Sequence, residues 1–84
     1  MTVIEQQIKK IVAEIIEISP DLVTNNAHFI EDLGADSMMA LEIVAALERE
    51  FKIMVPGERL PKIATLEQVT KLVNDLMGAQ TENG

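Results

Sequence analysis

The sequence predicts an all-α fold, a small four-helix bundle with three main helices, one short helix and a long loop between helices one and two. Aliphatic residues recur at spacings of three and four near both ends of the chain, which is the pattern of amphipathic helices. Residues 37–51 contain neither glycine nor proline and are dense in helix formers. Of the 84 residues, 48% are hydrophobic and none is cysteine, so packed aliphatic side chains must stabilise the domain without disulfides.

The first helix is predicted over about residues 3–18. Thr2 and Glu5 fit a capping box, in which a hydroxyl and a carboxylate three residues apart satisfy backbone N–H groups. Pro20 disfavours helical geometry in the residue before it, so we expect the helix to end near Ser19. The apolar stripe of this helix consists of Ile4, Ile8, Ile11, Val12, Ile15 and Ile16.

Residues 19–36 are predicted to form an ordered loop, because apolar residues such as Phe29 and Leu33 are interspersed among acids and turn formers. A loop of this length without regular structure is uncommon and is usually functional or disordered. The second helix follows over residues 37–51, and its polar residues fall mostly toward its C-terminal end.

The last third of the sequence predicts a short helical turn and then a longer helix. The turn is expected at residues 58–63, although Pro61 disfavours a regular helix there. Thr65 and Gln68 fit a second capping box at the start of the longer helix. The apolar stripe of that helix consists of Leu66, Val69, Leu72, Val73, Leu76 and Met77.

Gly78 stands at a position typical of helix ends, so we expect one helical domain over residues 1–78 and a flexible tail over residues 79–84. The longest apolar run, residues 43–47, is far shorter than the roughly 20 residues that a membrane span needs. The N-terminus lacks the basic region and apolar stretch of a signal peptide. We therefore expect a cytoplasmic protein without a membrane span.

The chain is acidic, with a net charge of −7, and residues 31–50 contain six acidic residues but only one basic residue. This acidity repels nucleic acid phosphates and favours basic protein surfaces as partners. A chain with one histidine and no cysteine offers no ordinary zinc site. No twelve-residue frame fits a calcium loop either, since one that begins at Asp32 places Ser37 sixth and Ile43 twelfth. We expect neither a nucleic acid partner nor a metal.

Ser37 lies at the boundary between the loop and the second helix and is one of only two serines. Backbone N–H groups at the start of a helix lack partners and lie at the positive end of the helix dipole, which favours a phosphate there. The position also suits a helix cap, a role that Ser37 or Asp36 could fill. A hydrolytic triad is not expected, because His28 is the only histidine and the G-x-S-x-G pattern is missing. We assign no catalytic residue.

Residues 29–38, with Asp-Leu-Gly-Ala-Asp-Ser at 32–37, and residues 42–44 and 47–51 together resemble the acyl carrier proteins of fatty acid and polyketide synthesis. The resemblance extends from the first helix to about Met77. It implies that a phosphopantetheinyl transferase attaches 4′-phosphopantetheine from coenzyme A to Ser37, and that acyl groups are carried as thioesters on the terminal thiol. It also implies that Asp36 supports recognition and local structure at the attachment point.

The same resemblance implies that the second helix is a partner-binding surface. Glu42 and Glu48 match acidic positions that steer docking to the basic patches of acyl-processing enzymes such as ketosynthases and acyltransferases. Met38 and Met39 offer an adaptable apolar contact beside the attachment point. The aliphatic faces of helices one, two and four are expected to enclose a pocket for the acyl chain. We expect a non-catalytic monomer.

Three departures from the family pattern bear on the pathway. Met39 replaces a residue that is often acidic in housekeeping fatty acid carriers, Arg49 interrupts a commonly acidic run, and Pro61 falls in the short third helix. They leave open whether the chain serves bulk fatty acid synthesis or a specialised pathway. Two alternatives also stay open: a carrier of aminoacyl or peptidyl intermediates, and an unmodified acidic helical module for protein interaction.

Overall fold

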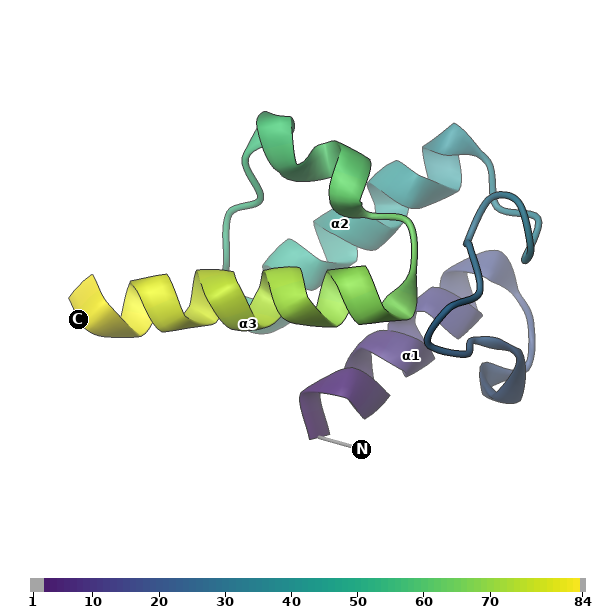
Figure 1. The fold of residues 1–84 in the computed structure, drawn as a ribbon, viewed down its shortest axis with the longest axis horizontal. Helices are drawn as coiled ribbons and strands as arrows, with labels where there is room; N and C mark the ends of the chain where they lie inside the picture. Colours follow the sequence, from purple (N-terminus) through teal and green to yellow (C-terminus); the bar gives the residue numbers. More distant parts are fainter. Residues whose placement is uncertain (1–2, 84) are drawn as a thin grey trace.

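The computed structural model describes residues 3–83, apart from the side chains of Lys62 and residues 79–83. They form three α-helices, α1 (Val3–Ile16), α2 (Ser37–Phe51) and α3 (Leu66–Asn83), and two 3₁₀ helices, η1 (Pro20–Leu22) and η2 (Gly57–Lys62) (Figure 1). Besides one isolated bridge between His28 and Thr65, the described residues contain no β-structure. The predicted all-α class is therefore confirmed, with η2 as the short helix.

The core lies between the three α-helices, because α1 packs against both α2 and α3. The predicted apolar stripes face this core, and η2 packs against α3. Burying each large aliphatic side chain contributes about 1.5–3 kcal/mol. No helix within residues 3–83 is long and apolar enough to cross a membrane. The largest fully buried side chains are those of Ile8, Val12, Val23, Phe29, Ile43, Leu47, Leu66, Val69, Leu72 and Val73.

Two helix boundaries match the sequence prediction because local caps fix them. α2 covers residues 37–51, as the absence of glycine and proline indicated. α3 begins after Thr65, whose hydroxyl oxygen accepts a hydrogen bond from the backbone N–H of Gln68 at 3.2 Å. This bond is the predicted cap of the last helix.

Two other boundaries differ from the prediction. α1 ends at Ile16 and not near residue 18, because Glu17 adopts the left-handed conformation with φ of 65°. Pro20 does more than stop a helix: it begins η1, which we did not predict, and the Ser19 hydroxyl accepts from the backbone N–H of Asp21 at 3.4 Å. Pro is well tolerated at the first position of a helix because that N–H has no helical partner.

The expected helix end at Gly78 is wrong, since α3 continues through it to Asn83. Glycine weakens a helix interior by about 1 kcal/mol relative to alanine and does not forbid it. The flexible tail over residues 79–84, the domain boundary before it and the capping box of Thr2 stay predictions. Thr2 and Gly84 lie outside the described residues.

The long loop is fixed to the start of α3. Phe29 is buried, and its backbone N–H donates to the carbonyl oxygen of Ala64 at 2.8 Å. The backbone N–H of Glu67 donates to the carbonyl oxygen of Asn25 at 3.2 Å. These contacts hold the loop against the segment that joins η2 to α3, and they place the end of the loop at the N-terminus of α2 (Figure 1).

Candidate functional site

Ser37 is the first residue of α2, and its side chain is exposed. Asp36 is the helix cap, because its carboxylate oxygen Oδ1 accepts a hydrogen bond from the backbone N–H of Met39 at 2.9 Å. The sequence left the cap to either residue, and the structure assigns it to Asp36. The Ser37 hydroxyl makes no hydrogen bond within the part of the chain that the structure describes, so it is available for chemistry.

The loop reaches Ser37 through a left-handed turn. Gly34 has φ of +80°, a conformation that residues with a side chain rarely adopt, whereas a Cβ atom there would meet nothing within 4 Å. The backbone conformation therefore explains this glycine, and crowding does not. The next residue, Ala35, is buried and donates its N–H to the carbonyl oxygen of Phe29 at 2.9 Å. Ala35 is therefore fixed in the core, and Ser37, two residues further on, lies at the surface.

A groove of about 350 Å³ lies beside Ser37, and we call it the Ser37 groove. The loop, α2, η2 and the segment before α3 form its walls. Ser37 and His28 are the only residues with polar side chains in this lining. Three of the lining hydrophobic residues, Ile30, Leu41 and Leu60, are exposed at the surface. The groove is lined by His28, Ile30, Ser37, Ala40, Leu41, Val44, Leu60, Pro61, Ile63 and Ala64.

This groove is not the pocket that we expected inside the bundle. The aliphatic faces of α1, α2 and α3 pack against one another as core, and no residue of α1 or α3 lines the Ser37 groove. The groove depends instead on residues far apart in the sequence, such as Leu41 and Leu60. Periodicity along one helix carries no signal for such a contact.

His28 organises the turn at the mouth of the groove. Its ring nitrogen Nδ1 accepts hydrogen bonds from the backbone N–H groups of Ile30 at 3.3 Å and Glu31 at 3.2 Å. Its own backbone N–H donates to the Asp32 carboxylate at 2.7 Å. The sequence predicts His28 as a loop or surface histidine and not as a base, and no pattern indicates its role in the turn, because imidazole is not among the usual capping groups. Its place beside Ser37 was missed.

The predicted docking residues differ in their surroundings. Met38 is 66% exposed, whereas Met39 is half-buried and packs against the core. Glu42 is exposed on α2. Glu48 is half-buried, and its carboxylate accepts from the backbone N–H of Val55 at 2.9 Å. Met38 and Glu42 thus lie open at the surface, while Met39 and Glu48 contribute to the fold.

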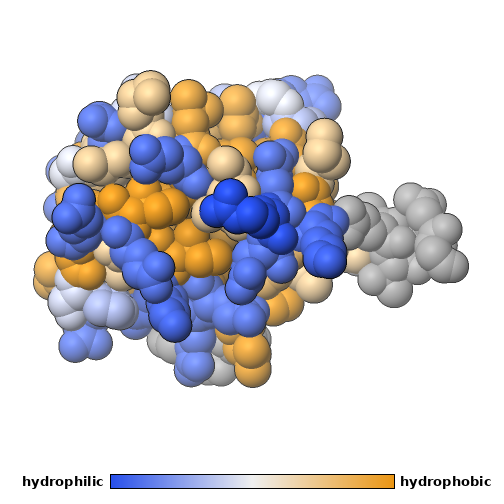
Figure 2. All heavy atoms as spheres, turned by 180° about the vertical axis from the view of Figure 1, so that it is seen from behind, coloured by the Kyte–Doolittle hydropathy of each residue, from blue (hydrophilic) through white to orange (hydrophobic). Residues whose placement is uncertain are grey.

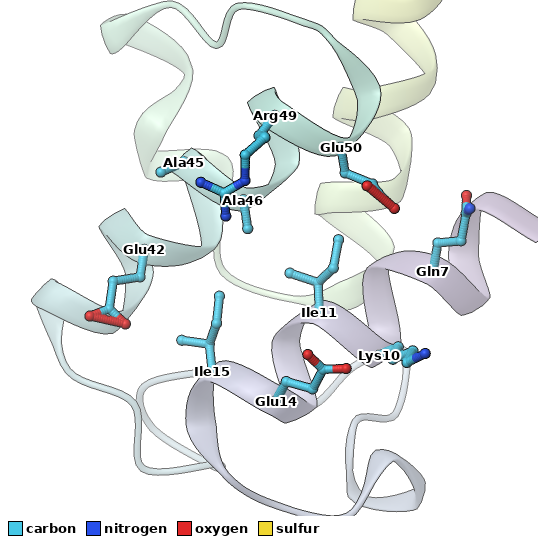
Figure 3. Close-up of a pocket in the computed structure, with 10 residues that line it drawn as sticks. All are labelled: Gln7, Lys10, Ile11, Glu14, Ile15, Glu42, Ala45, Ala46, Arg49 and Glu50. Atoms are coloured by element: carbon cyan, nitrogen blue, oxygen red, sulfur yellow. The ribbon is translucent and has the colours of Figure 1, made fainter.

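A second hollow of about 670 Å³ lies between α1 and α2 (Figure 3). Ile11 and Ile15 of α1 point toward Ala46 of α2 across it, and charged side chains surround them. On the face opposite to that of Figure 1, apolar surface is visible between hydrophilic residues (Figure 2). Glu42 borders this hollow and does not line the Ser37 groove. The predicted docking acid and the groove therefore lie on different sides of α2.

The surroundings of Ser37 suit a covalently held phosphate. The first backbone N–H groups of α2 lie at the positive end of the helix dipole, which is favourable for a negatively charged group. The exposed hydroxyl leaves room for a transferase to reach it, and the adjoining apolar groove offers a surface for an attached chain. The residues present therefore fit a phosphate-linked prosthetic group.

The comparison with known families agrees with this geometry. The family model described as "Phosphopantetheine attachment site" matches residues 6–73, which include most of α1, all of η1, α2 and η2, and the beginning of α3. Members of this family hold 4′-phosphopantetheine covalently and interact with a phosphopantetheinyl transferase and with acyl-processing enzymes. Carrier domains of this kind are generally non-catalytic. The chain belongs to the family of phosphopantetheine-bearing carrier proteins, which includes the acyl carrier proteins.

Proposed function

We propose that this protein carries acyl intermediates as thioesters on a 4′-phosphopantetheine arm attached to Ser37. It would present them to enzymes of fatty acid or polyketide type and would itself catalyse no reaction. One observation carries the proposal: the exposed Ser37 hydroxyl, which makes no hydrogen bond among the described residues, stands at the start of α2 beside an apolar groove.

The loading reaction places specific demands on Ser37. Its Oγ forms a bond to the phosphorus that carries pantetheine in coenzyme A, and the P–O bond of the pyrophosphate breaks. Adenosine 3′,5′-bisphosphate leaves, and a base of the transferase takes the hydroxyl proton. A hydroxyl engaged as a helix cap would have to give up its hydrogen bond first, whereas Asp36 already fills that role. Ser37 can therefore react without disturbing α2.

The groove favours an acyl cargo over an aminoacyl or peptidyl one. Its walls are almost wholly apolar, so a peptide amide placed there would lose hydrogen bonds with water and find few partners. An alkyl chain gains from the same burial.

Partner enzymes would dock on the outward surface near Ser37. Met38 and Leu41 supply exposed apolar contacts there, and Glu42 supplies a negative charge for a basic patch. Glu48 is less suited to docking because its carboxylate already accepts a hydrogen bond from the backbone N–H of Val55. Location in the cytoplasm would give such a carrier access to coenzyme A and soluble enzymes.

Mass spectrometry of the apo protein tests the proposal. Incubation with coenzyme A, magnesium and a broad-specificity phosphopantetheinyl transferase should add one phosphopantetheine group to the wild type and none to Ser37→Ala. Ser19→Ala is a matched control, because Ser19 is the only other serine and is also exposed. The control should load fully. Loading that persists in Ser37→Ala, or no loading of the wild type, would contradict the proposal.

A further inference from the structure

From the geometry of the Ser37 groove we infer that His28 selects acyl chains that carry a neutral oxygen, such as a hydroxyl or a ketone, over plain alkyl chains. This inference rests on the proposed function. The imidazole would donate a hydrogen bond from Nε2 to that oxygen, while the surrounding aliphatic side chains contact the rest of the chain.

The turn around His28 fixes which ring nitrogen is the donor. Nδ1 accepts from the backbone N–H groups of Ile30 and Glu31, and a nitrogen that accepts cannot also carry a proton. The ring proton of the accepting imidazole is therefore on Nε2. The backbone N–H of His28 also donates to the Asp32 carboxylate, which further restrains the position of the residue.

The Nε2 donor still lacks a close partner among the described residues. It contacts the Glu31 carboxylate, an ion-pair partner at 3.6 Å that is beyond the range of a hydrogen bond and belongs to a side chain that is 77% exposed. The His28 side chain is 33% exposed and lines the groove together with Ser37. His28 is thus the one residue in this lining, besides Ser37, whose side chain can donate a hydrogen bond to a chain in the groove.

The groove suits the cargo better than it suits the arm. Pantetheine contains two amides and a hydroxyl, and one imidazole donor could not replace the water that these groups would lose. A mainly aliphatic chain with one oxygen needs only one such partner. The oxygen should be uncharged, because the Glu31 carboxylate near Nε2 would repel a carboxylate on the cargo.

Protection of the thioester from hydroxylamine measures how firmly the cargo is held. The wild type and His28→Asn are loaded with octanoyl, 3-hydroxyoctanoyl, 8-hydroxyoctanoyl or suberoyl groups from the matching coenzyme A derivatives, and loading is first verified by mass. Asparagine keeps a side-chain acceptor for the turn but ends short of the position of Nε2. The thermal midpoint of each unloaded variant shows whether the fold is intact.

We expect at least one hydroxylated chain to be cleaved about 2- to 10-fold more slowly than octanoyl in the wild type, which is the effect of one hydrogen bond. In His28→Asn this difference should vanish, so that the hydroxylated chain and octanoyl are cleaved at the same rate. Leu60→Ala is the contrasting variant, since loss of an aliphatic wall should speed cleavage of all four chains alike. The suberoyl chain should gain no protection.

A spectroscopic measurement gives a second readout on the protein itself. The Nε2 resonance of His28 in ¹H–¹⁵N NMR should shift when the protected hydroxylated chain is present and stay in place with octanoyl. Equal cleavage of hydroxylated and plain chains, with no shift at Nε2, would overturn the role of His28. Protection of suberoyl would overturn the requirement for a neutral oxygen. Failure of loading would instead count against Ser37 as the attachment site.

Discussion

Both ends of α2 carry acidic residues, but the two ends differ in how their side chains are held. At the N-terminal end, the Asp36 carboxylate caps the helix and Met39 packs against the core, whereas Ser37 and Met38 are exposed. At the C-terminal end, the Glu48 carbonyl oxygen accepts from the N–H groups of Lys52 and Ile53. The Glu48 carboxylate accepts from Val55. The Glu48 carboxylate therefore stabilises the chain reversal, whereas the exposed Glu42, in the N-terminal half of the helix, is available for the docking that we propose.

The left-handed conformation of Lys52 brings the chain back to the point where the Glu48 carboxylate can accept a hydrogen bond. With φ of 55°, Lys52 turns the chain sharply after α2 and brings the following residues back beside the last turn of the helix. The returning Val55 N–H then meets the Glu48 side chain and not water. Ile53 is buried by the same reversal.

The largest effect on stability is expected at this C-terminal end. Glu48→Ala leaves the part-buried N–H of Val55 without its acceptor, and we expect the free energy of unfolding to fall by about 1–3 kcal/mol. Glu48→Gln keeps an oxygen at the same place and should lose clearly less. Glu42→Ala, at an exposed position, should stay within about 0.5 kcal/mol of the wild type. Urea denaturation followed by circular dichroism measures all three, and equal losses at both glutamates would remove the distinction between the two ends.

A smaller loss is expected at the N-terminal end. Asp36→Ala removes the cap on the Met39 N–H and should destabilise the protein by about 1 kcal/mol. Asp36→Asn should keep most of that stability, because asparagine caps a helix as well as aspartate does. Comparing the loading rate of both variants with a phosphopantetheinyl transferase separates the two roles. If the loading rate falls in Asp36→Asn as well as in Asp36→Ala, the transferase recognises the carboxylate. If the rate falls only in the less stable Asp36→Ala, Asp36 acts as a cap alone.

The smallest effect is expected on docking. Here Glu42 should matter more than Glu48, which is the reverse of their order in stability. Glu42→Gln is expected to slow acyl transfer to a ketosynthase or acyltransferase by about 2- to 5-fold at low salt, as the loss of one exposed ion pair would do. Glu48→Gln removes the same charge and should change the rate less. The difference should shrink at high salt because exposed charges are screened. A larger effect from Glu48→Gln would place the docking charge at the wrong end of α2 for our proposal.

Sequence patterns predicted those helix boundaries that are set by residues close together in the sequence. Residues 37–51 have no helix breaker, and Thr65 caps the residue three places on, so both signals are local. Weak signals failed, because Gly78 only lowers helix stability and Pro20 is compatible with the start of a helix as well as its end. The Ser37 hydroxyl and the Asp36 carboxylate compete for the same cap, and only the geometry distinguishes them.

The features missed from the sequence depend on contacts between distant residues. The Ser37 groove brings Leu41 together with Leu60, and no pattern within either segment indicates that they meet. Glu48 and Val55 meet only because Lys52 turns the chain. The role of His28 was missed for a different reason, since an imidazole rarely serves as the acceptor of a turn.

The attachment of η2 sets how the molecule can adapt to cargo of different length. Within the described residues, η2 packs against α3 and makes no backbone contact with α2, although the two form opposite walls of the groove. At one end of η2, Ala64 is held by the Phe29 N–H, and the other end begins at Gly57. An outward movement of η2 would widen the groove, but it would also loosen the packing of η2 on α3, expose the buried Ile63 and separate Arg59 from Asp75, whose charged groups lie 3.6 Å apart. Accommodating a longer chain would therefore draw on the same contacts that keep the protein folded.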